Sequence, residues 1–502
     1  MSLHVDEYGE IKISRHCRVK ENDASIRDGR DMQRTVDFRR MGWLTCATLA
    51  LGALIGAGAG LLTLLLYGVE HAMLGYIEGS ELPGPFGVPG MRRAISVTVG
   101  LTIAGVIWYL LRTRTARVPS VKKAVAGARM PWWQTIVHVV LQIFIVGSGA
   151  SIGREVAPRE LGAMLAQRFC DLFRIGADGS DAGAIDRRMI VAVAAGAGLG
   201  GVYNAPLAGM FFAVEILLVD VTLEKVAFGL GMSATAAFVA SLIKGRHTFY
   251  DITAMQPQST PSLMLFALLC GAACGVAGAL FRRGSSWASA HQPKDAAILW
   301  QMPLAGVLTG LVALLVPQVM GNGRAAAQLG FSTFLSEIAG LSGAAQSAAS
   351  AASSPWTLLA SSAGGAPNAG DTLSLAGWWT ILGVLALTFA AKTVMTLLTI
   401  RSGASGGVLQ PGIALGSTLG AMLGLVWMLV FPADSVTACA LIGAAALLSA
   451  SQQAPLMAMC LVMELTEAPI SFFVPVGLGV AASAFVSQWM LSRTTRRAEN
   501  GR

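Results

Sequence analysis

The stretch Ser148-Gly149-Ala150-Ser151-Ile152-Gly153 returns as Ser402-Gly403-Ala404-Ser405-Gly406-Gly407, with five of six positions identical at an offset of 254 residues. A second match follows each copy, because the segment from Asn204 to Glu215 returns from Gln453 to Glu464 at an offset of 249 residues. Small residues coincide easily by chance. Two matches in the same order and at nearly the same offset predict a chain built from two related halves.

The composition predicts that the chain lies in a lipid bilayer. Of its 502 residues, 54% are apolar and only 13% are charged, and 58 are glycine. A chain of this kind has too little polar surface for a soluble protein of this length. We therefore expect an all-α integral membrane protein.

Apolar segments that could enter the bilayer recur along the whole chain. They are Trp43–Leu66, Ala94–Leu111, Trp132–Val146, Met189–Ala205, Val221–Ile243, Leu263–Phe281, Ile298–Val316, Trp378–Ile400, Leu415–Phe431, Val436–Ser449 and Phe472–Leu491. Several are shorter than the roughly 20 residues that a straight span needs. Short segments interrupted by glycine and proline predict helices that stop inside the membrane, with their ends buried in protein or lining a cavity. In transporters built from two halves, such broken helices meet near the midplane and form the binding site.

The distribution of charge predicts the topology. The segment 112–129 carries six basic residues and no acidic one, whereas Tyr76–Pro89 carries only Glu78 and Glu81. By the positive-inside rule, the first loop is cytoplasmic and the second is external. We expect a multi-pass protein of the cell (inner) membrane.

The same features divide the chain into regions. Residues 1–42 are polar and lack the apolar core of a signal peptide, which predicts a cytoplasmic arm. The transmembrane domain is expected over 43–492, with halves at about 43–250 and 260–492 and a Ser/Ala/Gly-rich linker at 342–377. A short basic cytoplasmic tail is expected at 493–502.

Other classes of function find little support. The net charge of +8 lies mostly in the flanks of the apolar segments, which indicates topology and not nucleic-acid binding. The seven cysteines show neither metal-ligand spacing nor a disulfide framework, so we expect no metal and no cofactor. An enzyme using Ser148 or Ser151 as nucleophile would need a base, and His138 lies nearly three helical turns before Ser148. We expect no enzyme.

The chemistry concentrates in residues 147–160. Arg154 and Glu155 are costly in hydrocarbon, so they are expected to face a protein or water cavity. The neighbouring glycines let backbone N–H groups turn toward a common point, and a helix beginning near Glu155 aims the positive end of its dipole there. This arrangement predicts an anion site, and a structural Arg154–Glu155 pair at a helix end is the alternative.

Residues 403–411 repeat this arrangement of glycines before a helix start, with Pro411 placed for the first turn of the helix. Two helix N-termini are then expected to converge from the two halves. Backbone dipoles suit a small anion such as chloride, because they bind it without a full positive charge that would hold it too tightly. The carboxylate of Glu155 is itself an anion, and protonation or an incoming ion would displace it, so Glu155 is a candidate gate.

At these residues the chain resembles the CLC family of chloride channels and proton/chloride antiporters, of the bacterial type without CBS domains. The resemblance covers roughly Trp43–Leu491 and rests on Gly153-Arg154-Glu155, Gly407-Val408-Leu409-Gln410-Pro411 and Tyr203-Asn204-Ala205-Pro206-Leu207-Ala208-Gly209 followed by Glu215. It implies a CLC-type fold of two inverted-topology halves with many tilted and broken helices. It also implies a homodimer with one ion path per subunit, and Glu155 as the external gating glutamate.

The resemblance also implies which residues surround the anion. Backbone groups are expected to bind it at Ala116, Val156, Ala157, Val408 and Leu409, with support from Gly153, Arg154, Glu215, Gly407 and Pro411. Four of these positions depart from the family pattern: Ala116 stands where the family has a serine, Val156-Ala157 replaces Gly-Pro, and Leu409 replaces an aromatic residue. The preference for chloride over other anions is therefore left open.

Two further departures concern proton coupling. In the antiporters a second glutamate follows the position of Glu215 and accepts the internal proton, and here that residue is Ile216. No tyrosine follows Tyr250, so the internal-gate tyrosine is missing as well. Because Glu464 repeats Glu215, a structural role is favoured for both. We expect passive or weakly proton-coupled chloride conduction gated by Glu155; the alternative is a proton-coupled antiporter that uses Glu215 or a water chain.

Overall fold

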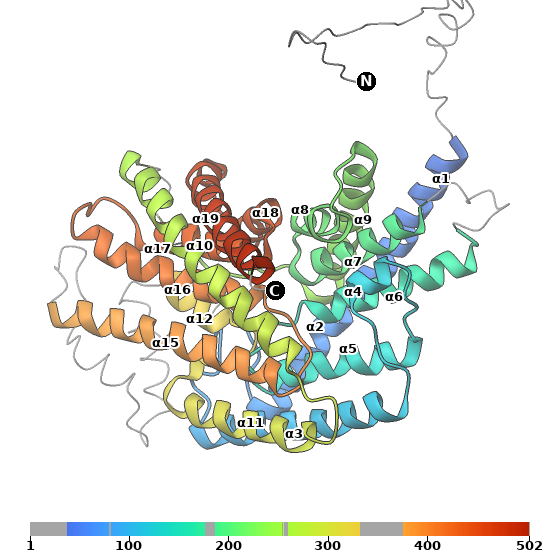
Figure 1. The fold of residues 1–502 in the computed structure, drawn as a ribbon, viewed down its shortest axis with the longest axis horizontal. Helices are drawn as coiled ribbons and strands as arrows, with labels where there is room; N and C mark the ends of the chain where they lie inside the picture. The colour runs from blue at the N-terminus through green and yellow to red at the C-terminus, as the bar shows by residue number, and fades with distance from the viewer. Residues whose placement is uncertain are drawn as a thin grey trace, which may run out of the picture.

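The computed structural model describes residues 38–79, 82–175, 186–253, 255, 260–331 and 375–500 (Figure 1). Within these ranges every regular element is a helix, and the pair Gly153 and Gly407 forms the one isolated β-bridge. The predicted all-α architecture is confirmed. Nearly all of the predicted arm 1–42 and most of the predicted linker 342–377 lie outside the described residues.

The first half of the chain contains the helices that carry the first copy of the repeat. They are α1 (Phe38–Cys46), a π-helical turn η1 (Ala47–Leu51), α2 (Gly52–Leu74), α3 (Gly90–Arg114), α4 (Val121–Val125), α5 (Trp132–Gly147), α6 (Val156–Leu172), α7 (Arg187–Tyr203), α8 (Pro206–Phe211), the π-helical η2 (Phe212–Leu218) and α9 (Leu223–Lys244).

The second half follows the connection after α9. Its elements are α10 (Pro261–Ala290), α11 (Ile298–Leu315), the 3₁₀ turn η3 (Pro317–Val319), α12 (Arg324–Phe331), α15 (Leu375–Arg401), α16 (Leu409–Met428), α17 (Val436–Gln452), α18 (Pro455–Thr466), the 3₁₀ turn η4 (Ile470–Phe472) and α19 (Phe473–Asn500).

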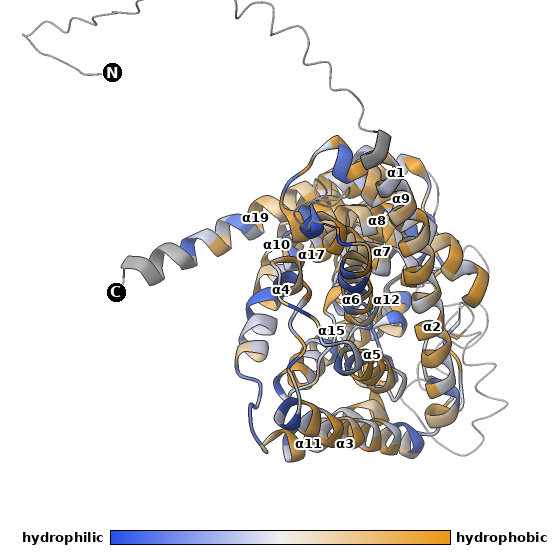
Figure 2. Ribbon diagram, turned by 90° about the vertical axis from the view of Figure 1, so that its right-hand side faces the viewer, coloured by the Kyte–Doolittle hydropathy of each residue, from blue (hydrophilic) through white to orange (hydrophobic). Residues whose placement is uncertain are grey.

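The helices have the composition of a multi-pass membrane protein. Eight helices in the described residues are long and apolar enough to cross a bilayer, and four apolar helical segments are only 10–17 residues long. Large apolar side chains such as Leu61 on α2 and Leu110 on α3 point outward, and Figure 2 shows apolar residues along the length of these helices. Such surfaces suit lipid, and the four short segments have the lengths expected of helices that stop inside the membrane.

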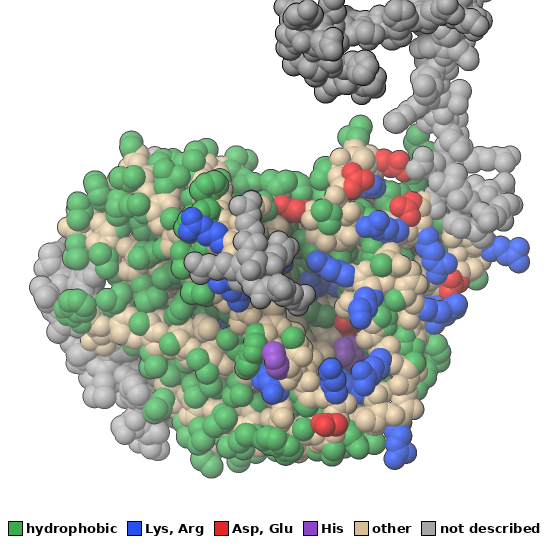
Figure 3. All heavy atoms as spheres, in the orientation of Figure 1, with side chains coloured by type: hydrophobic (Ala, Val, Ile, Leu, Met, Phe, Trp, Pro, Cys, Tyr) green, Lys and Arg blue, Asp and Glu red, His purple; other side chains and the backbone are tan. Residues whose placement is uncertain are grey.

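Basic side chains gather on one face of the molecule. The face toward the viewer in Figure 3, which carries α4 and the end of α19, shows many more Lys and Arg side chains than Asp and Glu. In Figure 2 this face lies on the left. Its positive charge agrees with the cytoplasmic side expected from the positive-inside rule.

The repeated sequence adopts a repeated backbone. Gly149 and Gly403 both have a left-handed conformation, with φ of +103° and +109°. α7 and α17 are each 17 residues long, and each ends at a left-handed residue, Asn204 (φ 53°) or Gln453 (φ 56°). Each is then followed by a helix with proline in its first turn. The two halves are therefore related in structure as well as in sequence.

Small residues let the helices approach closely. A Cβ atom added to Gly416 on α16 would lie 2.4 Å from the carbonyl oxygen of Gly443 on α17, and one added to Gly443 would lie 2.4 Å from that of Gly416. Close packing of this kind is how helices associate in a membrane, where the hydrophobic effect between helices is weak. The close packing against α17 holds α16 in place, and the N-terminus of α16 is part of the site described below.

Candidate functional site

The two copies of the glycine motif touch each other at the centre of the fold. The N–H of Gly153 donates to the carbonyl oxygen of Gly407, and the N–H of Gly407 donates to that of Gly153, both at 2.8 Å. The two residues are 254 positions apart, which is the offset of the repeat. Equivalent residues that bond to each other lie on the axis that relates the halves. This bridge places the first turns of α6 and α16 side by side.

Glu155 precedes α6 and reaches into the second half. Its side chain is fully buried, and its Oε1 accepts a hydrogen bond of 2.6 Å from the backbone N–H of Leu409, the first residue of α16. Oε2 is buried without a hydrogen-bond partner among the described residues. A carboxylate therefore occupies the positive N-terminal end of α16, which is where a free anion would be stabilised.

Only glycines fit around this carboxylate. A Cβ atom on Gly407 would lie 1.9 Å from Oε1 of Glu155, and one on Gly153 would lie 2.2 Å from Oε2. Distances this short are excluded by van der Waals repulsion. The bridge is thus also a cradle that is shaped to the carboxylate.

Arg154 turns away from Glu155. Its Nη1 lies 3.0 Å from Oε1 of Glu78 in a buried ion pair, and its guanidinium packs on the rings of Tyr203 and Phe249, with centroid distances of 5.6 and 5.4 Å. The alternative of a structural Arg154–Glu155 pair is therefore wrong. Because the charge of Arg154 is balanced by Glu78, Arg154 does not act as an unpaired cation beside Glu155.

The other predicted anion-binding residues fall into two groups. Val156 and Ala157 form the first turn of α6, directly after Glu155, and Val408 and Leu409 lie at the start of α16. Of these four, Leu409 binds the Glu155 carboxylate. Pro411 is buried in the first turn of α16. Ala116 lies apart, on the exposed connection between α3 and α4.

Glu215 lies far from this cradle in the chain and binds a different helix. Its carboxylate accepts hydrogen bonds from the N–H groups of Leu456 and Met457 in the first turn of α18, at 3.2 and 2.9 Å. The carboxylate of Glu464 accepts the N–H groups of Leu207 and Ala208 in the first turn of α8, both at 2.8 Å. Both glutamates cap helices, which supports the structural role that the sequence favoured.

Two buried polar groups near the site were missed by the sequence analysis. Lys392 on α15 is buried, and its Nζ donates to the carbonyl oxygens of Val319 and Gly321 at 2.9 Å each. A lone lysine inside an apolar segment is itself a signal of a functional or structural role. Tyr250 donates its hydroxyl to Oε1 of Gln410, the residue after Leu409.

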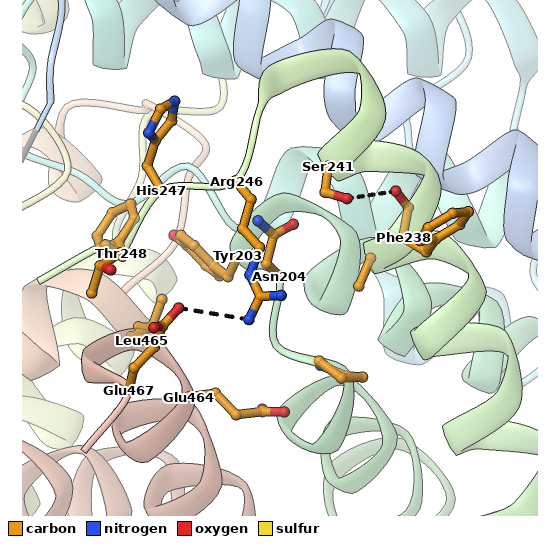
Figure 4. Close-up of a pocket in the computed structure, with 13 residues that line it drawn as sticks. Tyr203, Asn204, Phe238, Ser241, Arg246, His247, Thr248, Glu464, Leu465 and Glu467 are labelled. Carbon is orange, nitrogen blue, oxygen red and sulfur yellow. Dashed lines mark hydrogen bonds and ion pairs between the residues drawn. The ribbon is translucent and has the colours of Figure 1, made fainter. Parts of the chain in front are cut away.

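A pocket of about 410 Å³ opens beside the site (Figure 4). Tyr203 and Phe249, whose rings pack against Arg154, line it together with Glu464, and Arg246 faces Glu467 at 3.9 Å across it. A smaller cavity of about 30 Å³ reaches Arg154 itself. None of the predicted anion-binding residues lines the larger pocket. Within the described residues no group of three His, Cys, Asp or Glu side chains could hold a metal.

Comparison with known proteins agrees with this architecture. A family model described as "Voltage gated chloride channel" matches residues 99–488. The chain is 27% identical to the voltage-gated ClC-type chloride channel ClcB of Salmonella dublin, over 79% of this chain and 85% of that protein. It is 25% identical to the H(+)/Cl(-) exchange transporter ClcA of Yersinia pestis bv. Antiqua (strain Angola), over 77% of this chain and 74% of that protein.

The fold resembles solved structures as well. A slow cyanobacterial Cl⁻/H⁺ antiporter superposes with a TM-score of 0.66 at 19% sequence identity, over 88% of this chain and 95% of that one. At this identity the likeness concerns the fold, and it supports the arrangement of two halves described above.

Proposed function

This chain belongs to the voltage-gated chloride channel family, and on that premise we propose that it exchanges chloride for protons across the membrane, with Glu155 as the gate. Membership of the family indicates that the chain transports anions. The coupling to protons and the role of Glu155 are the proposal.

One observation carries the role of Glu155. Its buried carboxylate accepts the N–H of Leu409 inside the cradle of Gly153 and Gly407. An anion that uses the N-terminus of α16 needs the same donor, so carboxylate and anion compete for one position. Protonation removes the negative charge of Glu155 and weakens its hold on that donor, since charge-assisted hydrogen bonds are about twice as strong as neutral ones. Movement of the gate is thereby linked to a proton.

The names of the relatives favour exchange over passive conduction. ClcA of Yersinia is named as an H(+)/Cl(-) exchange transporter, whereas ClcB of Salmonella is named as a channel. The sequence alone favoured the passive mode because of Ile216. We now propose exchange as the main function and keep the passive mode as the second candidate.

A specific observation favours the second candidate. Glu215, the nearest acidic residue to Ile216 in the chain, is held by two backbone N–H groups. Both carboxylate oxygens are used to cap α18, so a proton on Glu215 would displace one of these bonds. A proton path through Glu215 is therefore disfavoured, and exchange needs another acceptor.

Chloride is proposed as the main anion. The described donor to the Glu155 carboxylate is the backbone N–H of Leu409. The buried cations Arg154 and Lys392 are bonded elsewhere, Arg154 to Glu78 and Lys392 to two backbone carbonyl oxygens. Neutral donors bind an anion weakly enough to release it. The exposed Ala116 offers no hydroxyl, so selectivity is proposed to rest on the first turns of α6 and α16.

A homodimer in the cell membrane is proposed on the basis of the family resemblance. Large apolar side chains at Val219, Leu223 and Ile470 are exposed near α8, α9 and α18. They would be covered by a second copy or by lipid. Cross-linking of the protein in liposomes, compared with the detergent-solubilised protein, distinguishes the two.

The experiment that tests exchange uses purified protein in liposomes with a chloride gradient and no protonophore. Proton movement against its own gradient, driven by chloride, supports the proposal. Chloride movement that stops when charge builds up, without proton movement, overturns exchange and leaves the passive mode.

A further inference from the structure

A buried polar network lies among three helices of the first half and has no role in the account above. Nε2 of His138 on α5 lies 3.6 Å from Oε2 of Glu160 on α6, and the same Oε2 accepts a bond of 2.7 Å from Gln142. Trp108 on α3 donates its indole N–H to Nδ1 of His138 at 2.9 Å. All four side chains are buried.

The tryptophan fixes the tautomer of the histidine. An indole N–H is a donor only, so Nδ1 of His138 must be the acceptor and carries no proton. The proton of the neutral ring is then on Nε2, which faces Glu160. A second proton on Nδ1 would confront the indole N–H, so His138 stays neutral while this bond is intact. Of the two titratable groups, Glu160 is the one that can gain and lose a proton.

The surroundings of Glu160 can accommodate both states of its carboxyl group. When ionised, it accepts the amide N–H of Gln142 and faces the Nε2–H of His138. When protonated, it has an acceptor available, because Oε1 of Gln142 is buried without a hydrogen-bond partner among the described residues. Rotation of the Gln142 amide presents that oxygen to the new O–H. An unmatched acceptor next to a buried carboxyl group is costly unless it is used.

The arginines near the network bind other groups. Arg112 on α3 donates to the carbonyl oxygen of Gly403 and to Ser405, at 2.8 and 3.1 Å. Arg159 on α6 donates to the backbone carbonyl oxygen of Glu155 at 2.7 Å and packs on Phe212. In the part of the chain that the structure describes, no Lys or Arg forms an ion pair with Glu160, and its neighbour His138 is neutral.

Along α6, Glu160 lies between Glu155 and the end of the helix near the face taken as cytoplasmic. Glu160 follows Glu155 by five residues, which is about 7.5 Å along the axis of α6 at 1.5 Å per residue. α6 then continues to Leu172, and α4 packs against it on the positively charged face of Figure 3. Along α6 in this direction, Glu160 is the first carboxyl group after Glu155.

We propose that Glu160 is an internal proton-binding site that passes protons between Glu155 and the cytoplasm. The step is a proton transfer relayed by water, because the two residues are five positions apart on the helix. One carboxyl O–H bond breaks as another forms, and nothing is oxidised or reduced. Glu160 thus supplies the carboxyl group that Ile216 lacks. The inference rests on the proposed proton-coupled exchange and gives it an acceptor other than Glu215.

The test is Glu160→Gln in liposomes, with chloride and proton fluxes measured together. Glutamine keeps the shape of the side chain and cannot carry the proton. We expect chloride flux to be retained, which also shows that the variant folds, and proton flux per chloride to fall by about a hundredfold, the scale typical of a positioned proton-transfer group. Glu160→Asp, which keeps a carboxyl group, should recover part of the coupling.

Asp171→Asn is the matched control, because Asp171 lies on the same helix but makes surface pairs with Arg129 and Arg187. It should leave both fluxes unchanged. If wild-type protein and Glu160→Gln move the same number of protons per chloride, this inference is overturned while exchange stands. If the wild-type protein moves no protons, exchange and this inference both fail.

Discussion

Glu215 and Glu464 each hold the first turn of a helix in the other half of the chain. The carboxylate of Glu215 binds the N-terminus of α18, the helix on which Glu464 lies, and the carboxylate of Glu464 binds the N-terminus of α8, which runs directly into Glu215. The two helix caps are reciprocal, and the capping residues are related by the 249-residue offset of the repeat. Four backbone N–H groups that a membrane-embedded helix start would otherwise leave unsatisfied are paired.

This relationship predicts matched effects for Glu215→Gln and Glu464→Gln. Each change removes a charged acceptor from a helix N-terminus, and each should lower the free energy of unfolding by about 0.5–2 kcal/mol, the usual range for a lost cap. Thermal unfolding of the purified variants measures the loss. The number of protons moved per chloride should stay at the wild-type value in both.

Glu464→Gln serves as the control for Glu215→Gln, because each side chain accepts two backbone N–H groups at the start of a helix. A loss of proton coupling in Glu215→Gln alone would show that Glu215 carries protons, against the structural role assigned to it.

The buried pair of Arg154 and Glu78 gives a second prediction. Arg154→Gln leaves Glu78 buried with Asn322 as its remaining side-chain donor, so unfolding should become easier by about 3–5 kcal/mol. Glu78→Gln combined with Arg154→Gln should be less destabilised than Arg154→Gln alone, since position 78 then carries no unpaired charge. Equal stability of the single and double variants would mean that the pair is not coupled.

The glycine cradle gives a third prediction. Gly407→Ala places a methyl group where Oε1 of Glu155 lies, so the carboxylate can no longer reach the N–H of Leu409. Chloride flux should then lose its pH dependence and stay high at neutral pH, with overpacking costing about 1–3 kcal/mol of stability. Gly383→Ala on α15 is the control, because nothing lies within 4 Å of its added Cβ atom. If the chloride flux of Gly407→Ala were low at neutral pH and still depended on pH, Gly407 would not be needed to seat the Glu155 carboxylate.

The exposed position of Ala116 gives a fourth prediction. Ala116→Ser adds one hydroxyl to the connection between α3 and α4, and a single hydrogen bond contributes about 0.5–1.5 kcal/mol. If this connection lines the anion path, as the resemblance implies, the ratio of chloride to nitrate flux should change by about two- to tenfold. Ser120→Ala on the same connection is the control. An unchanged ratio would place selectivity wholly at the starts of α6 and α16.

The sequence predicted the features that depend on local pattern. Gly149 and Gly403 are read directly from the repeat, and their matching left-handed conformations follow from the same residues in the same motif. The convergence of Gly153 and Gly407 follows from the symmetry that such a repeat implies. Burial of Glu155 follows from the cost of a carboxylate in hydrocarbon.

Partners that come from distant parts of the chain were not predictable. Arg154 pairs with Glu78, which lies on the connection between α2 and α3, and adjacency in sequence suggested Glu155 instead. His138 was considered only as a base for Ser148, whereas its contacts are Trp108 and Glu160 on neighbouring helices. These pairings depend on how helices rotate and pack, which apolar periodicity alone leaves undetermined.

The role of Glu155 as the gate is tested by comparing wild-type protein with Glu155→Gln in liposomes, with chloride flux and chloride-driven proton movement recorded across a range of pH. We expect wild-type chloride flux to depend on pH and to move protons, and Glu155→Gln to carry chloride at a rate independent of pH and to move no protons. A Glu155→Gln variant with the wild-type pH dependence and the wild-type proton movement would contradict this role.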